Sequence, residues 1–164
     1  MQLYLMQHGI ALPGADDAER PLSPAGVDQV RESAAGIKQL RLAFDLIMAS
    51  PKRRAHQTAA LIAEVLRYPY SDIARSDNLL PQAEPAEILN SLTAEPADSR
   101  VLLVGHQPCL GRLASHLLGG ARIAMENGGL CGFEYDPGQP FCMLKFLLSA
   151  DQLARFGASR TVDG

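Results

Sequence analysis

Short apolar runs recur along the chain and predict buried strands. Runs of this length, bounded by polar or turn-forming residues, are typical of strands that are covered on both faces. The clearest are residues 2–6, 44–50 ("FDLIMAS") and 100–105. Residues 71–76 are consistent with a further short strand. Residues 130–135 and 141–148 predict two strands on either side of the turn sequence "DPGQP".

Between these runs, apolar residues spaced three and four apart predict four amphipathic helices. A proline marks the expected start of each helix, at Pro24, Pro51, Pro85 and Pro108. Ser23 and Ser50 precede the first two prolines and are expected to cap those helices. Gly119-Gly120 should end the fourth helix. The polar stretch after Asp151 is expected to be a loose tail.

Strands that alternate with helices predict an α/β fold with three layers, in which helices cover both faces of a central, mostly parallel sheet. No linker divides the chain, so we expect residues 1–164 to form one domain. In such sheets, ligands bind beyond the carboxyl ends of the strands. His8 follows the first strand and His106 follows the strand at 100–105. If these strands are neighbours, both imidazoles project into one crevice.

Composition narrows the functional classes. The 164 residues are 47% hydrophobic and carry a formal net charge of −3, which gives no basic footprint for nucleic acid and no polybasic signal for a membrane surface. Three cysteines lack metal-ligand spacing and make a poor disulfide framework, so we expect reduced thiols and a cytoplasmic protein. The amino terminus resembles neither a signal peptide nor a spanning helix. We expect a monomer or a weak dimer.

The polar residues expected at the carboxyl ends of the strands suit an anion with several oxygens. Arginine forks and helix amino termini both favour such a ligand, and phosphate is the obvious candidate. Neutral imidazole is a good nucleophile towards phosphorus when its other N–H group is held by an acceptor such as a carbonyl. The residues in question are Gln7, His8, Arg20, Ser50, Arg53, Arg54, Glu84, His106 and Gln107.

A zinc site is the alternative interpretation of a histidine pair. No carboxylate or cysteine stands at a spacing that would support His8 and His106 as metal ligands. We therefore expect no metal and no other cofactor.

Four segments, in order, resemble motifs of the histidine phosphatase superfamily, and in particular of its small SixA-type phosphohistidine phosphatases. Each motif alone is weak, but four in the right order between residues 7 and 108 are specific. The segments are Gln7-His8-Gly9, which corresponds to the family's Arg-His-Gly, "RPLSPAG" at 20–26, "SPKRRAHQTA" at 50–59 and "VGHQP" at 104–108. The resemblance implies the phosphoglycerate mutase-like fold of that superfamily.

The resemblance also implies roles for the matching positions. His8 would be the phosphorylated nucleophile and His106 the second histidine that contacts the phosphoryl group. Glu84 falls where many relatives place the acid that protonates the leaving group, although phosphohistidine is an easy leaving group and needs no strong acid. The positions expected to bind substrate are Gln7, Gly9, Arg20, Arg54 and Gln107.

Gln7 departs from the family motif, which has arginine there. A hydrogen bond to a charged partner contributes roughly 1.5–3 kcal/mol, against about 1 kcal/mol for a neutral pair. Losing one charged contact would slow the reaction by roughly one to two powers of ten, because about 1.4 kcal/mol corresponds to a factor of ten. Gln7 therefore puts the rate, the phosphate affinity and the substrate in question, but not the fold.

The resemblance, together with a compact chain that has no inserts to enclose a small metabolite, favours removal of phosphate from phosphohistidine on a protein. A phosphorelay or phosphotransferase-system carrier would be such a partner. A phosphatase acting on small phosphomonoesters is the alternative within the same enzyme class, and a phosphoglycerate mutase fits less well. Gln7 also motivates a different class, a phosphoprotein-binding pseudophosphatase with little turnover.

Overall fold

The structure is a computed structural model that describes residues 1–14, 16–139 and 142–159. Six strands form one sheet in the order β3-β2-β4-β1-β5-β6, in which the first four are mutually parallel and β5 and β6 are antiparallel to their neighbours. The strands are β1 (Gln2–Gln7), β2 (Leu46–Ala49), β3 (Ala74–Arg75), β4 (Arg100–Gly105), β5 (Leu130–Glu134) and β6 (Met143–Leu148).

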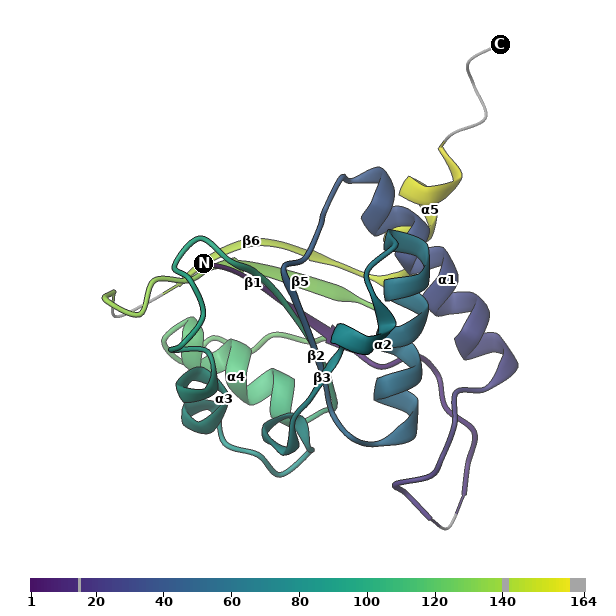
Figure 1. Ribbon diagram of the computed structural model, residues 1–164, viewed down its shortest axis with the longest axis horizontal. Coiled ribbons are helices and arrows are strands. Elements are labelled where there is room, and N and C mark those ends of the chain that lie inside the picture. Colours follow the sequence, from purple (N-terminus) through teal and green to yellow (C-terminus); the bar gives the residue numbers. More distant parts are fainter. Residues whose placement is uncertain (15, 140–141, 160–164) are drawn as a thin grey trace.

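Five helices lie on the two faces of this sheet, so the three-layer α/β prediction is confirmed (Figure 1). On one face α1, α2 and α5 pack over Tyr4 and Met6 of β1, and on the other α3 and α4 pack over Leu3 and Leu5. This division follows from the alternation of side chains along a strand. The helices are α1 (Pro24–Gln39), α2 (Arg53–Leu66), α3 (Pro85–Ser91), α4 (Cys109–Leu117) and α5 (Ala150–Ala158), with short 3₁₀ turns at Tyr70–Asp72 and Asp77–Leu79.

The structure confirms one of the two predicted serine caps and contradicts the other. Ser23 caps α1, where its hydroxyl accepts a hydrogen bond from the Gly26 N–H group at 3.0 Å. The cap predicted at Ser50 is wrong, because α2 begins later, at Arg53, and its N-cap residue Lys52 makes no side-chain cap. The Ser50 hydroxyl is instead engaged with the ring of His106, at 2.8 Å.

The loose tail predicted after Asp151 is also wrong for most of its length. Residues 150–158 form α5, which begins with a capping box between Ser149 and Gln152. Leu153 is fully buried against α1. A Cβ atom at Gly36 would lie 2.1 Å from the Leu153 carbonyl oxygen, so only glycine permits this approach. Residues 160–164 lie outside the described residues, as does residue 141 of the predicted strand 141–148.

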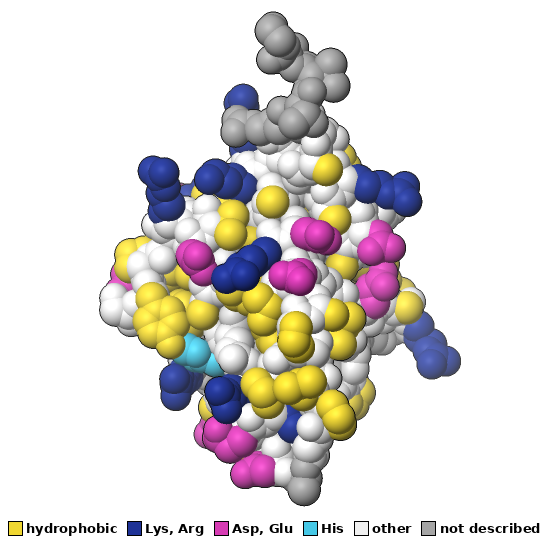
Figure 2. Space-filling view, turned by 90° about the vertical axis from the view of Figure 1, so that its right-hand side faces the viewer, with side chains coloured by type: hydrophobic (Ala, Val, Ile, Leu, Met, Phe, Trp, Pro, Cys, Tyr) yellow, Lys and Arg dark blue, Asp and Glu magenta, His cyan; other side chains and the backbone are white. Residues whose placement is uncertain are grey.

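The face made by α1, α2 and α5 carries both signs of charge. Figure 2 shows basic and acidic side chains interspersed over this face, with apolar side chains between them. In the part of the chain that the structure describes, no helix is both long enough and apolar enough to cross a bilayer.

Candidate active site

The two histidines come together because β1 and β4 are neighbours. Gln7 and Gly105 are the last paired residues of these parallel strands, and the His8 N–H group donates to the Gly105 carbonyl at 3.1 Å. The segments that follow β1 and β4 then leave the sheet at the same edge. The imidazole centroids of His8 and His106 are 4.9 Å apart, which is the convergence expected from the strand ends.

Arg54 fixes the protonation state of His8. Its Nε atom donates to His8 Nε2 at 3.1 Å, and the residue as a whole is 5% exposed. Guanidinium only donates, so Nε2 must carry a lone pair. The remaining proton is then on Nδ1, which lies 2.7 Å from the Gly9 carbonyl oxygen. Burial and the neighbouring Arg54, Arg20 and Lys52 lower the pKa of His8 to about 4, although the Gly9 carbonyl opposes this. The ring is therefore neutral at pH 7.

His106 is more deeply enclosed, with 2% of its surface exposed. Its Nε2 atom lies 2.8 Å from Ser50 Oγ, whereas Nδ1 is buried and has no hydrogen-bond partner among the described residues. Burial, followed by the proximity of His8 and the cations, lowers the pKa of His106 to about 3. An unpartnered buried ring nitrogen beside His8 is unusual, and a bound ligand would satisfy it.

One turn of α2 ties the site to the rest of the fold. Thr58 Oγ1 accepts from the Gly9 N–H group at 3.1 Å and donates to the Arg54 carbonyl at 2.8 Å. Gln57 Oε1 accepts from the Leu22 N–H group at 2.8 Å. Arg54, Gln57 and Thr58 of the "RAHQT" segment therefore each hold a different point of the one loop between β1 and α1.

Two residues of the site were missed by the sequence reasoning. Asn127 precedes β5, and its Nδ2 atom donates to the His8 carbonyl at 2.7 Å. Asp17 lies in the loop after β1, where its Oδ1 atom is 3.1 Å from Arg54 Nη2 and 3.5 Å from Arg20 Nη1. Asp17 Oδ2 also pairs with Lys52 Nζ. No periodic pattern or motif in the sequence singles out either residue.

Comparisons with known proteins agree with this geometry. The family model of the histidine phosphatase superfamily (branch 1) matches residues 3–78. The phosphohistidine phosphatase SixA of Escherichia coli (strain K12) is 33% identical over 128 residues, which span 73% of this chain and 76% of SixA. This chain belongs to the histidine phosphatase superfamily. It is a phosphatase of that superfamily, related to SixA.

Two further matches extend over most of the chain. An uncharacterized protein of Picosynechococcus sp. (strain ATCC 27264 / PCC 7002 / PR-6) is 34% identical over 140 residues, covering 80% of this chain and 84% of the relative. A structure of SixA complexed with tungstate superposes with a TM-score of 0.84 at 28% identity, covering 93% of this chain and 99% of that one.

In this histidine phosphatase, Gln7 and Gln107 lie on the α4 side of the strand ends. Gln7 shares the face of Leu3 and Leu5, by strand alternation, and its Oε1 atom is buried without a partner among the described residues. Gln107 Nε2 is likewise buried and unpaired there. No hydrogen bond of either side chain joins it to a histidine, so substrate contact by Gln7 and Gln107 remains a prediction.

Glu84 lies apart from the histidine phosphatase pocket. It is the exposed N-cap residue of α3 and lines a hollow with Arg112, Ser115 and His116 of α4. In the described parts of the chain, no hydrogen bond or ion pair connects its carboxylate to His8 or His106. Its assignment as the acid remains a prediction from the resemblance alone.

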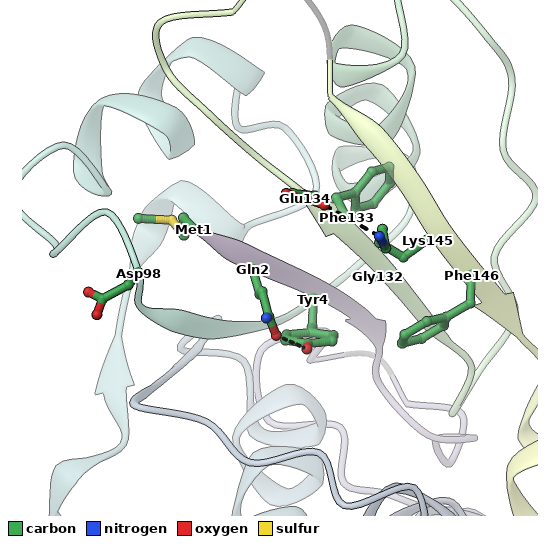
Figure 3. Close-up of a pocket in the computed structure, with 9 residues that line it drawn as sticks. All are labelled: Met1, Gln2, Tyr4, Asp98, Gly132, Phe133, Glu134, Lys145 and Phe146. Atoms are coloured by element: carbon green, nitrogen blue, oxygen red, sulfur yellow. Dashed lines mark hydrogen bonds and ion pairs between the residues drawn. The ribbon is translucent and has the colours of Figure 1, made fainter.

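Another hollow lies at the opposite end of the strands. It has a volume of about 500 Å³ and is lined by Met1, Gln2 and Tyr4 at the start of β1, and by residues of β5 and β6 (Figure 3). Tyr4 donates its hydroxyl hydrogen to Gln2 Oε1 at 2.7 Å, and Lys145 pairs with Glu134. None of the residues of the predicted phosphoryl site lines it.

Proposed function

We propose that this protein removes the phosphoryl group from phosphohistidine on a partner protein, through a phosphorylated His8. The observation that carries the proposal is the Arg54 Nε to His8 Nε2 hydrogen bond of 3.1 Å. It leaves the lone pair of a neutral imidazole directed at the cation that would bind the phosphoryl oxygens. Nucleophile and electrostatic stabiliser are thereby positioned together before substrate arrives.

The reaction has two steps. In the first, the His8 Nε2 lone pair attacks phosphorus, an N–P bond forms, and the P–N bond of the substrate breaks as its imidazole leaves with the electron pair and takes up from solvent a proton that the second step returns. Arg54 then donates to the phosphoryl oxygens, since Nε2 no longer accepts. In the second step, water attacks phosphorus, the His8 N–P bond breaks, and inorganic phosphate and neutral His8 are released.

His106 would act as a second phosphoryl ligand. Ser50 Oγ lies 2.8 Å from its Nε2 atom. If the serine hydroxyl donates to that nitrogen, the ring proton stays on Nδ1, and Nδ1–H donates to a phosphoryl oxygen. That hydrogen bond would satisfy the one ring nitrogen that has no partner among the described residues.

Two points favour a protein substrate. The related SixA is named a phosphohistidine phosphatase, and the mouth of the site is accessible from solvent. Asp17 and Arg20 at the mouth are 48% and 31% exposed in their side chains, so a bulky partner can reach the site. Small phosphomonoesters are the alternative substrates, and a binding module with little turnover is the alternative function that Gln7 favours.

The test is a single-turnover assay with a phosphorelay or phosphotransferase-system carrier phosphorylated on histidine, run beside a panel of phosphomonoesters. We expect phosphate release and an acid-labile, base-stable phosphoryl adduct that is lost in His8→Ala, while His116→Ala, which alters an exposed histidine of α4, retains both. Turnover that is unchanged in His8→Ala would reject the nucleophile. Binding without release would favour the module, and faster hydrolysis of the phosphomonoesters would favour the small-molecule phosphatase.

A further inference from the structure

Three cationic side chains converge on a single carboxylate at the mouth of the site. Asp17 contacts Arg54 Nη2 at 3.1 Å, Arg20 Nη1 at 3.5 Å and the Lys52 ammonium. The carboxylate side chain is 48% exposed, whereas those of Lys52 and Arg54 are 17% and 6% exposed. Lys52 and Arg54 are therefore held inside, whereas Arg20, at 31%, and the anion that joins the three cations lie nearer the surface.

The Lys52 side chain is mostly covered, unlike those of most lysines, which extend into solvent. It is the N-cap residue of α2, and its backbone N–H group lies 3.4 Å from Ser50 Oγ, the hydroxyl that holds His106. Burial and the adjacent Arg54 lower the pKa of Lys52, and its charge contributes to lowering the pKa of both His8 and His106. Lys52 thus acts electrostatically on the same small volume as the two histidines.

The charges around this volume suit a dianion better than they suit Asp17. Three cations contact one carboxylate, and Asp16 adds a second negative charge near Lys52, so the cluster keeps a net positive charge, and a phosphoryl group on a side chain carries a charge of roughly −1.5 to −2. We propose that Lys52 binds the phosphoryl group together with Arg20 and Arg54, in place of the Asp17 carboxylate, and so supplies the positive charge that Gln7 lacks.

This inference rests on the proposed function only in requiring that the site bind a phosphoryl oxyanion. Asp17 then serves as an internal anion that offsets part of the positive charge in the free protein and moves aside when substrate binds. Because the Asp17 side chain is half exposed, it can leave the cluster without unpacking any buried group. Charged contacts of this kind are strong, so removing either partner has a measurable effect on oxyanion affinity.

The test is calorimetric titration with tungstate, a tetrahedral oxyanion that needs no turnover. Lys52→Gln should weaken tungstate binding by about tenfold or more, the value of one charged hydrogen bond. Arg53→Gln is the matched control, since it removes the same charge from the next residue, which is exposed, and it should change the affinity by less than about threefold, as expected of a screened surface charge. Equal losses in the two variants, or no loss in Lys52→Gln, would overturn the inference.

Two further variants test the compensation directly. Gln7→Arg should restore most of the affinity that Lys52→Gln loses, and should gain less in the wild-type background, because the two cations serve the same ligand. Asp17→Asn should tighten tungstate binding by removing the competing charge, and weaker binding would show that Asp17 organises the site instead. If the wild type binds tungstate but releases no phosphate from phosphohistidine, the proposed function fails and this inference stands. If the wild type binds no tungstate, both fail.

Discussion

Lowering the pH from 8 to 5 should destabilise this protein through its two buried histidines. In the folded state, burial lowers the pKa of His8 to about 4 and that of His106 to about 3, from an ordinary value of 6.5. Both rings therefore stay neutral at pH 5 in the folded chain but take up protons in the unfolded chain. Because the unfolded state binds more protons, the free energy of unfolding falls as the pH drops below 6.5.

The size of the effect follows from the same values. At pH 5 the folded rings are still almost wholly neutral, so the loss depends on the distance between pH 5 and the unfolded pKa of 6.5. Each unit is worth about 1.4 kcal/mol, which gives about 2 kcal/mol for each histidine. Above pH 6.5, the neutral rings make most of their contribution to the free energy of unfolding. This contribution falls as the pH drops, and it stops falling only below the pKa values of the two histidines in the folded state. The depressed pKa of Asp45, about 2, enters only at lower pH.

Urea denaturation of the wild type and of His106→Gln at pH 8 and pH 5 measures this directly. The glutamine amide can still reach Ser50 but does not titrate, so the pH-dependent loss should shrink by about 2 kcal/mol. His56, whose pKa burial also lowers, contributes equally to both proteins and cancels. His116→Gln, on an exposed ring of α4, should show the wild-type difference. If His106→Gln loses as much stability as the wild type, the argument from burial to a neutral ring is refuted.

Two other predictions concern the packing that holds the site and the last helix. Thr58→Val removes the acceptor of the Gly9 N–H group and should cost about 1–3 kcal/mol of stability and slow turnover. Thermal unfolding checks this with Thr58→Ser as control, which keeps the hydroxyl, lacks the methyl group and should lose less, so that equal losses in the two variants would contradict the hydrogen-bond reasoning. Leu153→Ala, in the fully buried core face of α5, should cost about 2–5 kcal/mol. Exposed Arg155→Ala should cost about 0.5 kcal/mol or less in the same urea titration, and similar costs would mean that α5 is not docked.

The strands and most helices could be predicted because their signals are local. Each apolar run is a strand, and Pro24 and Pro85 stand at the first turn of their helices. The meeting of His8 and His106 required one further assumption, that their strands are neighbours, and the sheet order confirms it. Arg54 followed from the family motif, and its place on the first turn of α2 brings it to His8.

The missed features depend on contacts between distant parts of the chain. Asn127 reaches the His8 carbonyl only because β5 pairs with β1. Ser50 has the sequence of a helix cap, but a histidine more than fifty positions away takes its hydroxyl. The helix α5 differs from these features, because its sequence does carry a local signal that the prediction of a loose tail left out. Ser149 and Gln152 stand at the spacing of a capping box, which marks the start of a helix.

The central position of β1 determines when the site can assemble during synthesis. Of the strands of the sheet, the one that precedes His8 is made first, yet its two neighbours are β4 and β5, which end at residues 105 and 134. Such long-range pairing is slow to form, and a growing chain folds only as its partners emerge. A nascent chain that ends before β4 contains His8 and Arg54 but has no Gly105 carbonyl to hold the His8 backbone. Activity should therefore appear late in translation, in one step, once the sheet closes around its oldest strand.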